Sequence, residues 1–405
     1  MSGASAQRSQ NDAGTGSVST TAPNDRLWIG RIAITDFRSY AAAAIDTGPE
    51  PVVLIGQNGA GKTNLLEAIS LLAPGSGLRR AGYDELARIG GGGGWAVAAR
   101  VNSREGPVDI GTGQRTDSRP EGGRSGRVVR INGESASTGA LADLVDVVWL
   151  TPTMDGLFTG PAADRRQFLD RLVLCFDPGH AARSARFERA MRQRNRALED
   201  DASDVTLLDG LEIQMAETGV SIAAARMEAV AALEAMGRDR RARDQASPFP
   251  WFEVTLDGTL EDELRSSAAV EIEDRYRERL RQARGRDRAA GRTLEGPHRS
   301  DLLVTHGPKS MPARLGSTGE QKALLAGLVL SHAALIGERR TGGAPILLLD
   351  EVAAHFDDLR RAALFEEILA LQAQAWMTGT ERAAFSGLAG KAFFARIEAG
   401  RATVD

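Results

Sequence analysis

GQNGAGKTN, residues 56–64, lies between two apolar runs, PVVLI at 51–55 and LLEAI at 65–69. It fits the pattern G-x-x-x-x-G-K-[ST], and the runs predict a buried strand before the loop and a helix from Lys62 onward. The backbone N–H groups of such a loop hold α and β phosphates, and its lysine reaches the β and γ phosphates. The alternative is a glycine-rich turn with a stray lysine, but the whole chain has only four lysines. The residues expected to bind a nucleotide are Gly56, Gln57, Asn58, Gly59, Ala60, Gly61, Lys62, Thr63 and Asn64.

A second motif, ILLLDE at 346–351, places two acids directly after an apolar strand. Ligands of open α/β sheets bind outside the carboxyl ends of the strands. We therefore expect Asp350, together with Thr63, to hold Mg²⁺, and Glu351 to act as general base toward a water. With Lys62, the two acids are the expected catalytic residues. The alternative is a pair of helix-capping acids, because the first turn of a helix favours negative charge.

A third motif precedes the apolar helix expected at 319–337. Its serine or threonine can cap that helix, and an acid or amide three residues later would complete a capping box. A helix start with small residues is also an anion site, so it can receive the γ phosphate of a nucleotide held by another subunit. The residues of this trans signature are Ser317, Thr318, Gly319 and Glu320.

The order of these motifs predicts an unusual division of the chain. Almost 290 residues separate the loop from the acid pair. All-apolar strands separated by helices imply a parallel sheet covered on both faces, so the fold class is α/β. The predicted division is a disordered tail at 1–25, an ATPase head from 26–163 and 294–405, and an inserted helical lobe at 164–293.

Local patterns predict the individual elements. Strands are expected at 27–35, 51–55, 95–101, 127–131, 251–256, 345–349 and 374–377. Helices are expected at 211–243, 268–284, 319–337 and 359–371. The Gly-, Arg- and Ser-rich stretch 102–126 is expected to be a linker.

Bulk properties exclude some functions. The chain has 405 residues, a net charge of -4 and a pI of about 5.9, so any DNA site must be a local patch. Its single cysteine, Cys175, cannot form an internal disulfide and is expected to be buried. No apolar run is long enough for a membrane helix, and the first 25 residues lack a signal-peptide core, so a cytoplasmic location is expected.

Beyond the loop, four stretches resemble the RecF family of recombination mediators, an SMC-like branch of the ABC ATPases. They are DFRSY at 36–40, WLTP through FTGP to RRQFLD within 149–170, GPHRSD at 296–301 and AAHFD at 353–357. The resemblance runs from about Leu27 to the C-terminus. It implies an ABC-type head with an inserted helical lobe, and it identifies Asp357 as the D-loop acid, which helps to join two subunits.

By this resemblance, ATP with Mg²⁺ drives a head-to-tail homodimer that holds DNA near single-strand gaps. With RecO and RecR it helps to load RecA, and slow hydrolysis releases the DNA. The protein would be cytoplasmic and associated with the nucleoid. Three departures from the family pattern are visible: Ser300 replaces an acid, Glu320 adds a charge to the signature, and Thr378 stands where transporter ATPases carry a histidine.

Other classes stay open at this point. A transporter ATPase subunit would share the three motifs but should carry the switch histidine, a small-molecule kinase would share only the loop, and a Rad50-type protein would need a Cys-x-x-Cys apex. Arginine clusters at 191–196, 238–243 and 275–292 either bind DNA phosphates or form solvated helix faces. The pairs Arg165–Arg166 and His298–Arg299 either position nucleic acid or respond to nucleotide.

Overall fold

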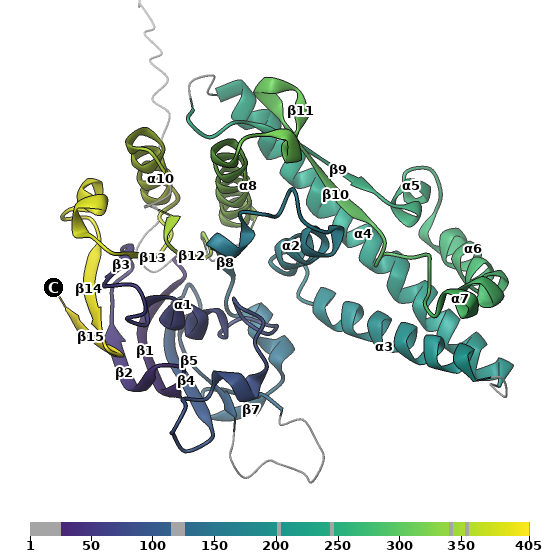
Figure 1. The fold of residues 1–405 in the computed structure, drawn as a ribbon, viewed down its shortest axis with the longest axis horizontal. Coiled ribbons are helices and arrows are strands. Elements are labelled where there is room, and N and C mark those ends of the chain that lie inside the picture. Colours follow the sequence, from purple (N-terminus) through teal and green to yellow (C-terminus); the bar gives the residue numbers. More distant parts are fainter. Residues whose placement is uncertain are drawn as a thin grey trace, which may run out of the picture.

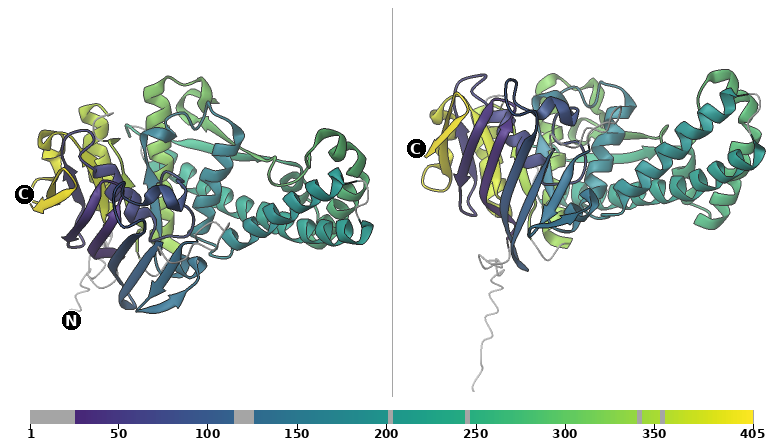
Figure 2. Two further views of the ribbon diagram at one scale, coloured as in Figure 1. Left: turned by 60° about the horizontal axis from the view of Figure 1, so that its bottom comes forward. Right: turned by 90° about the horizontal axis from the view of Figure 1, so that it is seen from below.

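The computed structural model describes residues 26–114, 126–200, 204–243, 247–339, 343–352 and 356–404. The tail expected at 1–25 and residues 353–355 of the D-loop stretch lie outside this part of the chain. A compact head and a helical arm that projects from one side are visible in Figure 1 and Figure 2. Within the described ranges, no helix combines the length and the apolar character that crossing a membrane requires.

A six-stranded sheet at the centre of the head has the order β15-β14-β3-β13-β12-β8. The pairs from β14 through β8 are parallel, and only β15 is antiparallel to its neighbour. Every residue of β3, β8, β12 and β13 is buried, as expected for a parallel sheet covered on both faces. The bounds are β3 Val52–Ile55, β8 Val147–Leu150, β12 Ile346–Leu349, β13 Ala375–Gly379, β14 Phe393–Glu398 and β15 Arg401–Val404. The sheet therefore joins strands from both ends of the chain.

Alternate residues of the central strands enter two different cores. On β3, Val52 and Leu54 pack toward α1 (Lys62–Ser70) and the N-terminal strands, whereas Val53 and Ile55 face the other core. That second core holds α2 (Ala162–Leu174), α8 (Thr318–Arg339) and α10 (Asp358–Leu371). Helices thus cover one face of the parallel sheet, and α1 with the N-terminal strands covers the other, which confirms the predicted α/β fold class.

A second sheet is antiparallel, with the order β2-β1-β4-β5-β6-β7. Its strands are β1 Trp28–Phe37, β2 Tyr40–Asp46, β4 Trp95–Ser103, β5 Gly106–Gln114, β6 Val128–Ile131 and β7 Glu134–Ala136. The prediction of a linker throughout 102–126 was wrong, because β5 occupies part of that stretch. Glycines and a proline conceal the strand in the sequence, but its alternate residues Ile110, Thr112 and Gln114 point inward when it pairs with β4.

The arm consists mainly of α3 (His180–Glu199), α4 (Val205–Arg243), α6 (Ala269–Gln282) and α7 (Arg284–Ala290) (Figure 1). The 39 residues of α4 make it the longest helix described. Its predicted start at 211 was six residues late. At about 1.5 Å per residue it reaches roughly 58 Å, so one helix connects the head to the tip of the arm.

A small antiparallel sheet, β11-β10-β9, joins the arm to the head. β9 (Phe252–Asp257) lies in the predicted lobe, and its partner β10 (Asp301–His306) lies in the predicted head. The C-terminal half of α4 enters the same core as α8. Arm and head thus share a continuous core here. The remaining elements are β11 Met311–Pro312, α5 Thr259–Leu264 and the 3₁₀ turns η2 Tyr83–Leu86, η4 Thr138–Asp143, η5 Pro152–Met154, η6 Gly307–Lys309, η7 Ala313–Leu315 and η8 Arg382–Leu388.

Candidate functional site

The loop at 56–64 connects β3 to α1 in a tight curve. Gly59 and Gly61 have φ angles of 82° and 112°, which side chains of L-residues disfavour. A Cβ atom on Gly61 would also lie 2.9 Å from Ser39 Oγ and from the Tyr40 hydroxyl. The glycines are therefore required by backbone shape and by the DFRSY stretch packed under the loop.

Lys62 is folded back over this loop. Its Nζ donates hydrogen bonds to the carbonyl oxygens of Gly56, at 2.6 Å, and Gln57, at 2.9 Å. Burial lowers the pKa of Lys62, and the charges of Glu351 and Asp350 act in the opposite direction. The ammonium group thus lies within the field of both acids, at the place where a β or γ phosphate would enter.

Asp350 lies opposite Thr63 although 287 residues separate them. Thr63 Oγ1 is 2.9 Å and 3.0 Å from the two carboxylate oxygens of Asp350. The pair forms because β3 and β12 are parallel with only β13 between them, so their carboxyl ends meet at one edge of the sheet. Within the described residues, the side-chain partners of the Asp350 carboxylate are both hydroxyls, which favours a cation site over helix capping.

Thr378, at the end of β13, is the second of these hydroxyls. Its Oγ1 donates to Asp350 Oδ1 at 2.8 Å and accepts from the backbone N–H of Glu351 at 2.8 Å. The side chain is buried. It is the residue that the sequence comparison placed at the position of the transporter histidine. The motifs did not identify it as a site residue. The sequence did contain a signal for it, because Thr378 is a polar residue at the end of an apolar strand. In the sheet, this strand lies between the strand that precedes the loop and the strand that precedes the acid pair.

Glu351 has a φ angle of 54°, in the left-handed region. Such a conformation costs a non-glycine residue about 1–3 kcal/mol and is often found at functional sites. The hydrogen bond from its N–H to Thr378 helps to hold this backbone in place. At this strand end Asp350 points toward Thr63, and the backbone of Glu351 is held by Thr378.

The signature residues form the capping box that the sequence predicted. Ser317 N–H donates to Glu320 Oε2 at 2.8 Å, and Glu320 N–H donates to Ser317 Oγ at 3.4 Å. Lys309 forms an ion pair with Glu320, and these bonds, the one to Lys309 first, lower the pKa of Glu320 to about 2. Ser317, Thr318 and Gly319 are exposed. No hydrogen bond between described residues joins them to the loop of the same chain.

Asp357 caps α10, since its side chain accepts a hydrogen bond from the Arg360 N–H at 2.8 Å. Together with Phe356 it is the described part of the D-loop stretch, which stays an assignment by resemblance.

The two family-specific strings contact each other. Arg165 makes a bidentate ion pair with Asp301 at 2.7 Å and 2.8 Å, and Arg166 donates to the carbonyl of Ser300 at 2.7 Å. The Ser300 hydroxyl donates to the buried carboxylate of Glu261 at 2.6 Å. An acid at position 300 would place two carboxylates together, so Ser300 fits its neighbour. These arginines hold α2 against β10.

A second junction lies nearby, where Arg226 of α4 donates to both carboxylate oxygens of Asp170, at 2.8 Å and 2.9 Å. Burial raises the pKa of Asp170, but hydrogen bonds from His180 and Arg226 outweigh it and lower the pKa to about 2. His298 bonds to the Thr293 carbonyl at 3.0 Å. No cluster of three or more His, Cys, Asp or Glu side chains that could hold a metal is found in the described residues.

Many arginines of the clusters that could either bind DNA or form solvated helix faces have partners inside the arm. Arg194 is fully buried and pairs with Glu212 at 2.9 Å and Asp287 at 2.8 Å. Arg275, Arg279, Arg281, Arg284 and Arg286 also form ion pairs with acids of the arm. This pairing favours the structural interpretation for the clusters at 191–196 and 275–292.

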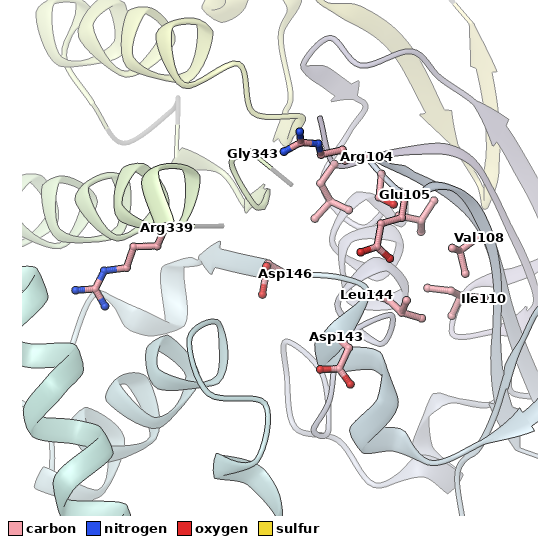
Figure 3. A pocket seen from close by; sticks show the side chains of 12 residues that line it. Arg104, Glu105, Val108, Ile110, Asp143, Leu144, Asp146, Arg339 and Gly343 are labelled. Carbon is pink, nitrogen blue, oxygen red and sulfur yellow. The ribbon is translucent and has the colours of Figure 1, made fainter. Parts of the chain in front are cut away.

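A hollow of about 320 Å³ lies at the other edge of the central sheet, and Figure 3 shows its lining. It includes Asp146, directly before β8, and Arg104 and Glu105 of the β4–β5 turn. β8 and β12 are parallel, so Asp146 and the acid after β12 lie at opposite ends of the strands. The hollow is thus separate from the phosphate loop.

The chain is similar to known proteins over most of its length. Residues 28–388 match the family model RecF/RecN/SMC N terminal domain. The DNA replication and repair protein RecF of Mesorhizobium japonicum is 58% identical over 373 residues, which cover 92% of this chain and 96% of that protein. The protein of the same name from Brucella suis is 52% identical over 380 residues, 94% of this chain and 97% of that protein.

Two solved structures have the same fold. The recombination mediator RecF-ATP of the RecFOR pathway aligns with a TM-score of 0.80 at 22% identity, covering 95% of this chain and 99% of that one. The Smc head domain of Pyrococcus furiosus, bound to the C-terminal domain of ScpA, aligns with a TM-score of 0.52 at 16% identity, over 94% and 96%. The fold is therefore that of an ABC-type ATPase head with an inserted helical arm, and the sequence identity to its curated relatives shows that the chain belongs to the RecF family.

Proposed function

We propose that this protein is an ATP-driven DNA clamp of recombinational repair and replication restart. Two copies would join head to tail, with each ATP between the loop of one copy and Ser317 of the other. The closed dimer would hold DNA at single-strand gaps and, with RecO and RecR, assist the loading of RecA. The observation that carries the proposal is the convergence of Lys62, Thr63, Asp350 and Glu351 at one sheet edge.

The phosphates of ATP would replace the carbonyl oxygens that Lys62 now contacts. The residues fit Mg²⁺ as well, because Thr63 and Asp350 offer a hydroxyl and a carboxylate oxygen within 2.9 Å of each other. The ion would neutralise charge on the phosphates. Thr63 and Asp350 would then exchange their mutual hydrogen bond for the cation, while Thr378 keeps Asp350 in its orientation.

Glu351 would accept a proton from the water that attacks the γ phosphate. The hydrogen bond of its N–H to Thr378 and its left-handed backbone conformation restrict where the carboxylate can point. Thr378 in place of a switch histidine is consistent with slow hydrolysis, so that ATP acts as a timer for the closed state.

The signature helix suits a site shared between two copies. Ser317, Thr318 and Gly319 face solvent at the start of α8 and have free access to a second molecule. The extra charge of Glu320 does not project freely toward that molecule, since it is bound to the Ser317 N–H and to Lys309. Asp357, at the start of α10, would lie beside the same contact.

The DNA part of the proposal rests on the relatives, which are named for DNA replication and repair, and on the RecFOR pathway to which the structural relative belongs. These names also support RecO and RecR as partners, and a place in the cytoplasm on the nucleoid. Preference for gaps and assistance to RecA follow from the family resemblance.

A glutamine at position 351 tests the clamp. E351Q should bind ATP with Mg²⁺ but hydrolyse it far more slowly, so sedimentation should find dimers in excess ATP that stay on gapped DNA. K62A is the matched control and should remain monomeric, with no ATP affinity in a titration. The proposal would be contradicted if sedimentation found E351Q entirely monomeric in excess ATP, or if K62A kept its affinity for ATP.

A transporter ATPase subunit is the second candidate, because it shares the loop, the acid pair and the signature. Its histidine position is occupied by Thr378, which is buried and already bonded to both acids. A DNA effect on ATP turnover would separate the clamp from a transporter subunit and from a small-molecule kinase.

A further inference from the structure

A cavity of about 550 Å³ opens between the segment after α1, the segment after β8 and the helix α2. Its lining includes Arg79, Arg80, Trp149, Phe168 and Arg171, but no residue of the phosphate loop, the acid pair or the signature. The volume lies within the range of about 300–1,000 Å³ that is common for small-molecule sites.

Arg171, in the last turn of α2, lies in this cavity in an unusual state. Its guanidinium carbon is 4.2 Å from the centroid of the Trp149 ring and 5.4 Å from that of Phe168. Its only hydrogen-bond acceptor among the described residues is the sulfur of Met154, at 3.8 Å, and its buried Nε has none. Across the described part of the chain, no carboxylate forms an ion pair with Arg171. Arg171 as a whole is half-buried, but its Nε is shielded from solvent. A cation that is partly desolvated and has no anion beside it among the described residues is costly, so a missing counter-ion is implied.

The charge around the cavity is positive. Burial and the neighbouring charge of Arg80 lower the pKa of Arg171 to about 9. Asp164 is the one acid among the lining residues. The next acid along the chain from β8, Asp155, is engaged by Lys322 at 2.8 Å. Arg79 pairs with Glu67 at 3.4 Å. Arg80 and Arg171 are thus the lining guanidinium groups that have no ion pair among the described residues.

An arginine stacked on an aromatic ring keeps its N–H edge available for a ligand. Its side chain is already held in place, so it loses little conformational entropy when the ligand binds. That planar edge matches phosphate oxygens in a bidentate manner. The apolar surfaces of Trp149 and Phe168 would suit the flat or carbon-rich part of the same ligand. We propose that the cavity formed by Arg171, Arg80 and Trp149 binds a phosphate group carried on a nucleotide, at a site separate from the ATP loop.

The cavity is connected to the ATP site by short contacts. Arg79 Nη1 donates to Asn64 Oδ1 of the phosphate loop at 2.8 Å. Thr151, which lines the cavity, follows Leu150, whose carbonyl accepts a hydrogen bond from Asp350 N–H at 2.9 Å. Occupation of the cavity and of the loop can therefore influence each other.

A DNA strand and a free nucleotide both carry this phosphate chemistry. The choice of DNA rests on the proposed function, whereas the site itself does not. Titration calorimetry of full-length K62A with inorganic phosphate and with dAMP tests the site without binding at the loop. Binding of a phosphorylated DNA duplex to the protein that retains Lys62, measured over a salt series, tests whether the phosphate comes from DNA or from a free nucleotide.

The variants are R171Q, R80Q and, as a control for loss of one exposed positive charge, R130Q. Arg80 is exposed, so R80Q tests the site even if R171Q fails to fold. We expect R171Q and R80Q to weaken dAMP binding by about tenfold or more, since charge-assisted hydrogen bonds are lost. The slope of log K against log[salt] for DNA should fall by about one for each. R130Q should retain the dAMP affinity. In proteins that keep Lys62, none of the three substitutions should change the affinity for ATP.

The proposal would be overturned if R171Q and R80Q bound dAMP, phosphate and DNA as tightly as R130Q and the protein without these substitutions. Loss of dAMP binding with an unchanged salt slope would establish the site and identify a free nucleotide as its ligand. Absence of any DNA binding by the unsubstituted protein would contradict the proposed clamp, while the dAMP titration would still decide the cavity.

Discussion

Replacing Thr378 by valine should slow ATP hydrolysis without preventing ATP binding. Valine has the shape of threonine, so the change removes only the hydroxyl between Asp350 Oδ1 and the Glu351 N–H, both at 2.8 Å. Hydrogen bonds to charged groups contribute about 1.5–3 kcal/mol, and a buried N–H without a partner costs about 1–3 kcal/mol. Because the two effects overlap at one side chain, T378V should lower the free energy of unfolding by about 2–4 kcal/mol.

The effect of T378V on the rate of ATP hydrolysis follows from the positions of Asp350 and Glu351, which the Thr378 hydroxyl helps to hold. A displacement of about 1 Å in a catalytic group costs up to about 100-fold in rate, so we expect turnover in T378V to fall by about 10- to 100-fold. T378S keeps the hydroxyl and loses one methyl group, so it should lose about 1 kcal/mol of stability and little activity.

Steady-state phosphate release and ATP titration, with urea unfolding monitored in parallel, measure all three quantities. Turnover of folded T378V at the wild-type rate would refute the argument that Thr378 positions the two acids. A loss of the same size in T378S would show that packing, and not the hydroxyl, is responsible.

Three further substitutions, in two experiments, test the described packing. Burial lowers the pKa of His332 to about 3. The folded protein therefore keeps this imidazole neutral, whereas the unfolded chain protonates it near pH 6.5. The stability contributed by the neutral side chain is fully present above pH 6.5 and is lost as the pH falls toward 3, by about 1.4 kcal/mol per pH unit. In H332Q, which keeps a donor for the Leu172 carbonyl, urea midpoints should change less between pH 6.5 and 5 than in wild type, and equal slopes would count against this origin. R194M removes the buried ion-pair partner of Asp287 and one of the two arginines on Glu212, so it should lower the free energy of unfolding by about 3 kcal/mol or more. R192M removes an exposed i,i+4 pair on the same helix and should change it by less than about 0.5 kcal/mol; similar losses in both variants would contradict the assignment of Arg194 to the core of the arm.

The segments predicted well are those whose signal is local. β3 and β12 are runs of apolar residues next to a loop or an acid pair, and α4 repeats apolar residues over many turns. β5 was missed because its glycines, proline and aspartate carry no strand signal of their own. It becomes a strand through pairing with β4 on one side and β6 on the other.

The arginine clusters show the same limit for charge. The sequence presents Arg194 and Arg192 as members of one basic stretch, yet one is fully buried between two acids and the other is exposed. Their difference lies in the face of α3 that packs against α4 and α7, which no count of charges contains.

The sequence alone was enough to predict a nucleotide site in this protein, since the loop, the acid pair and the signature each depend on a few adjacent residues. The tertiary structure decided how these parts combine. The sheet order brings β3, β13 and β12 together and so places Thr378 between Asp350 and the Glu351 N–H. The meeting of the segment after α1, β8 and α2 leaves Arg171 stacked on Trp149, with no carboxylate partner in the described part of the chain. The physical reason is range: local backbone and hydrophobic preferences act over a few residues, whereas these contacts join positions up to 287 residues apart and exist only once the strands have paired.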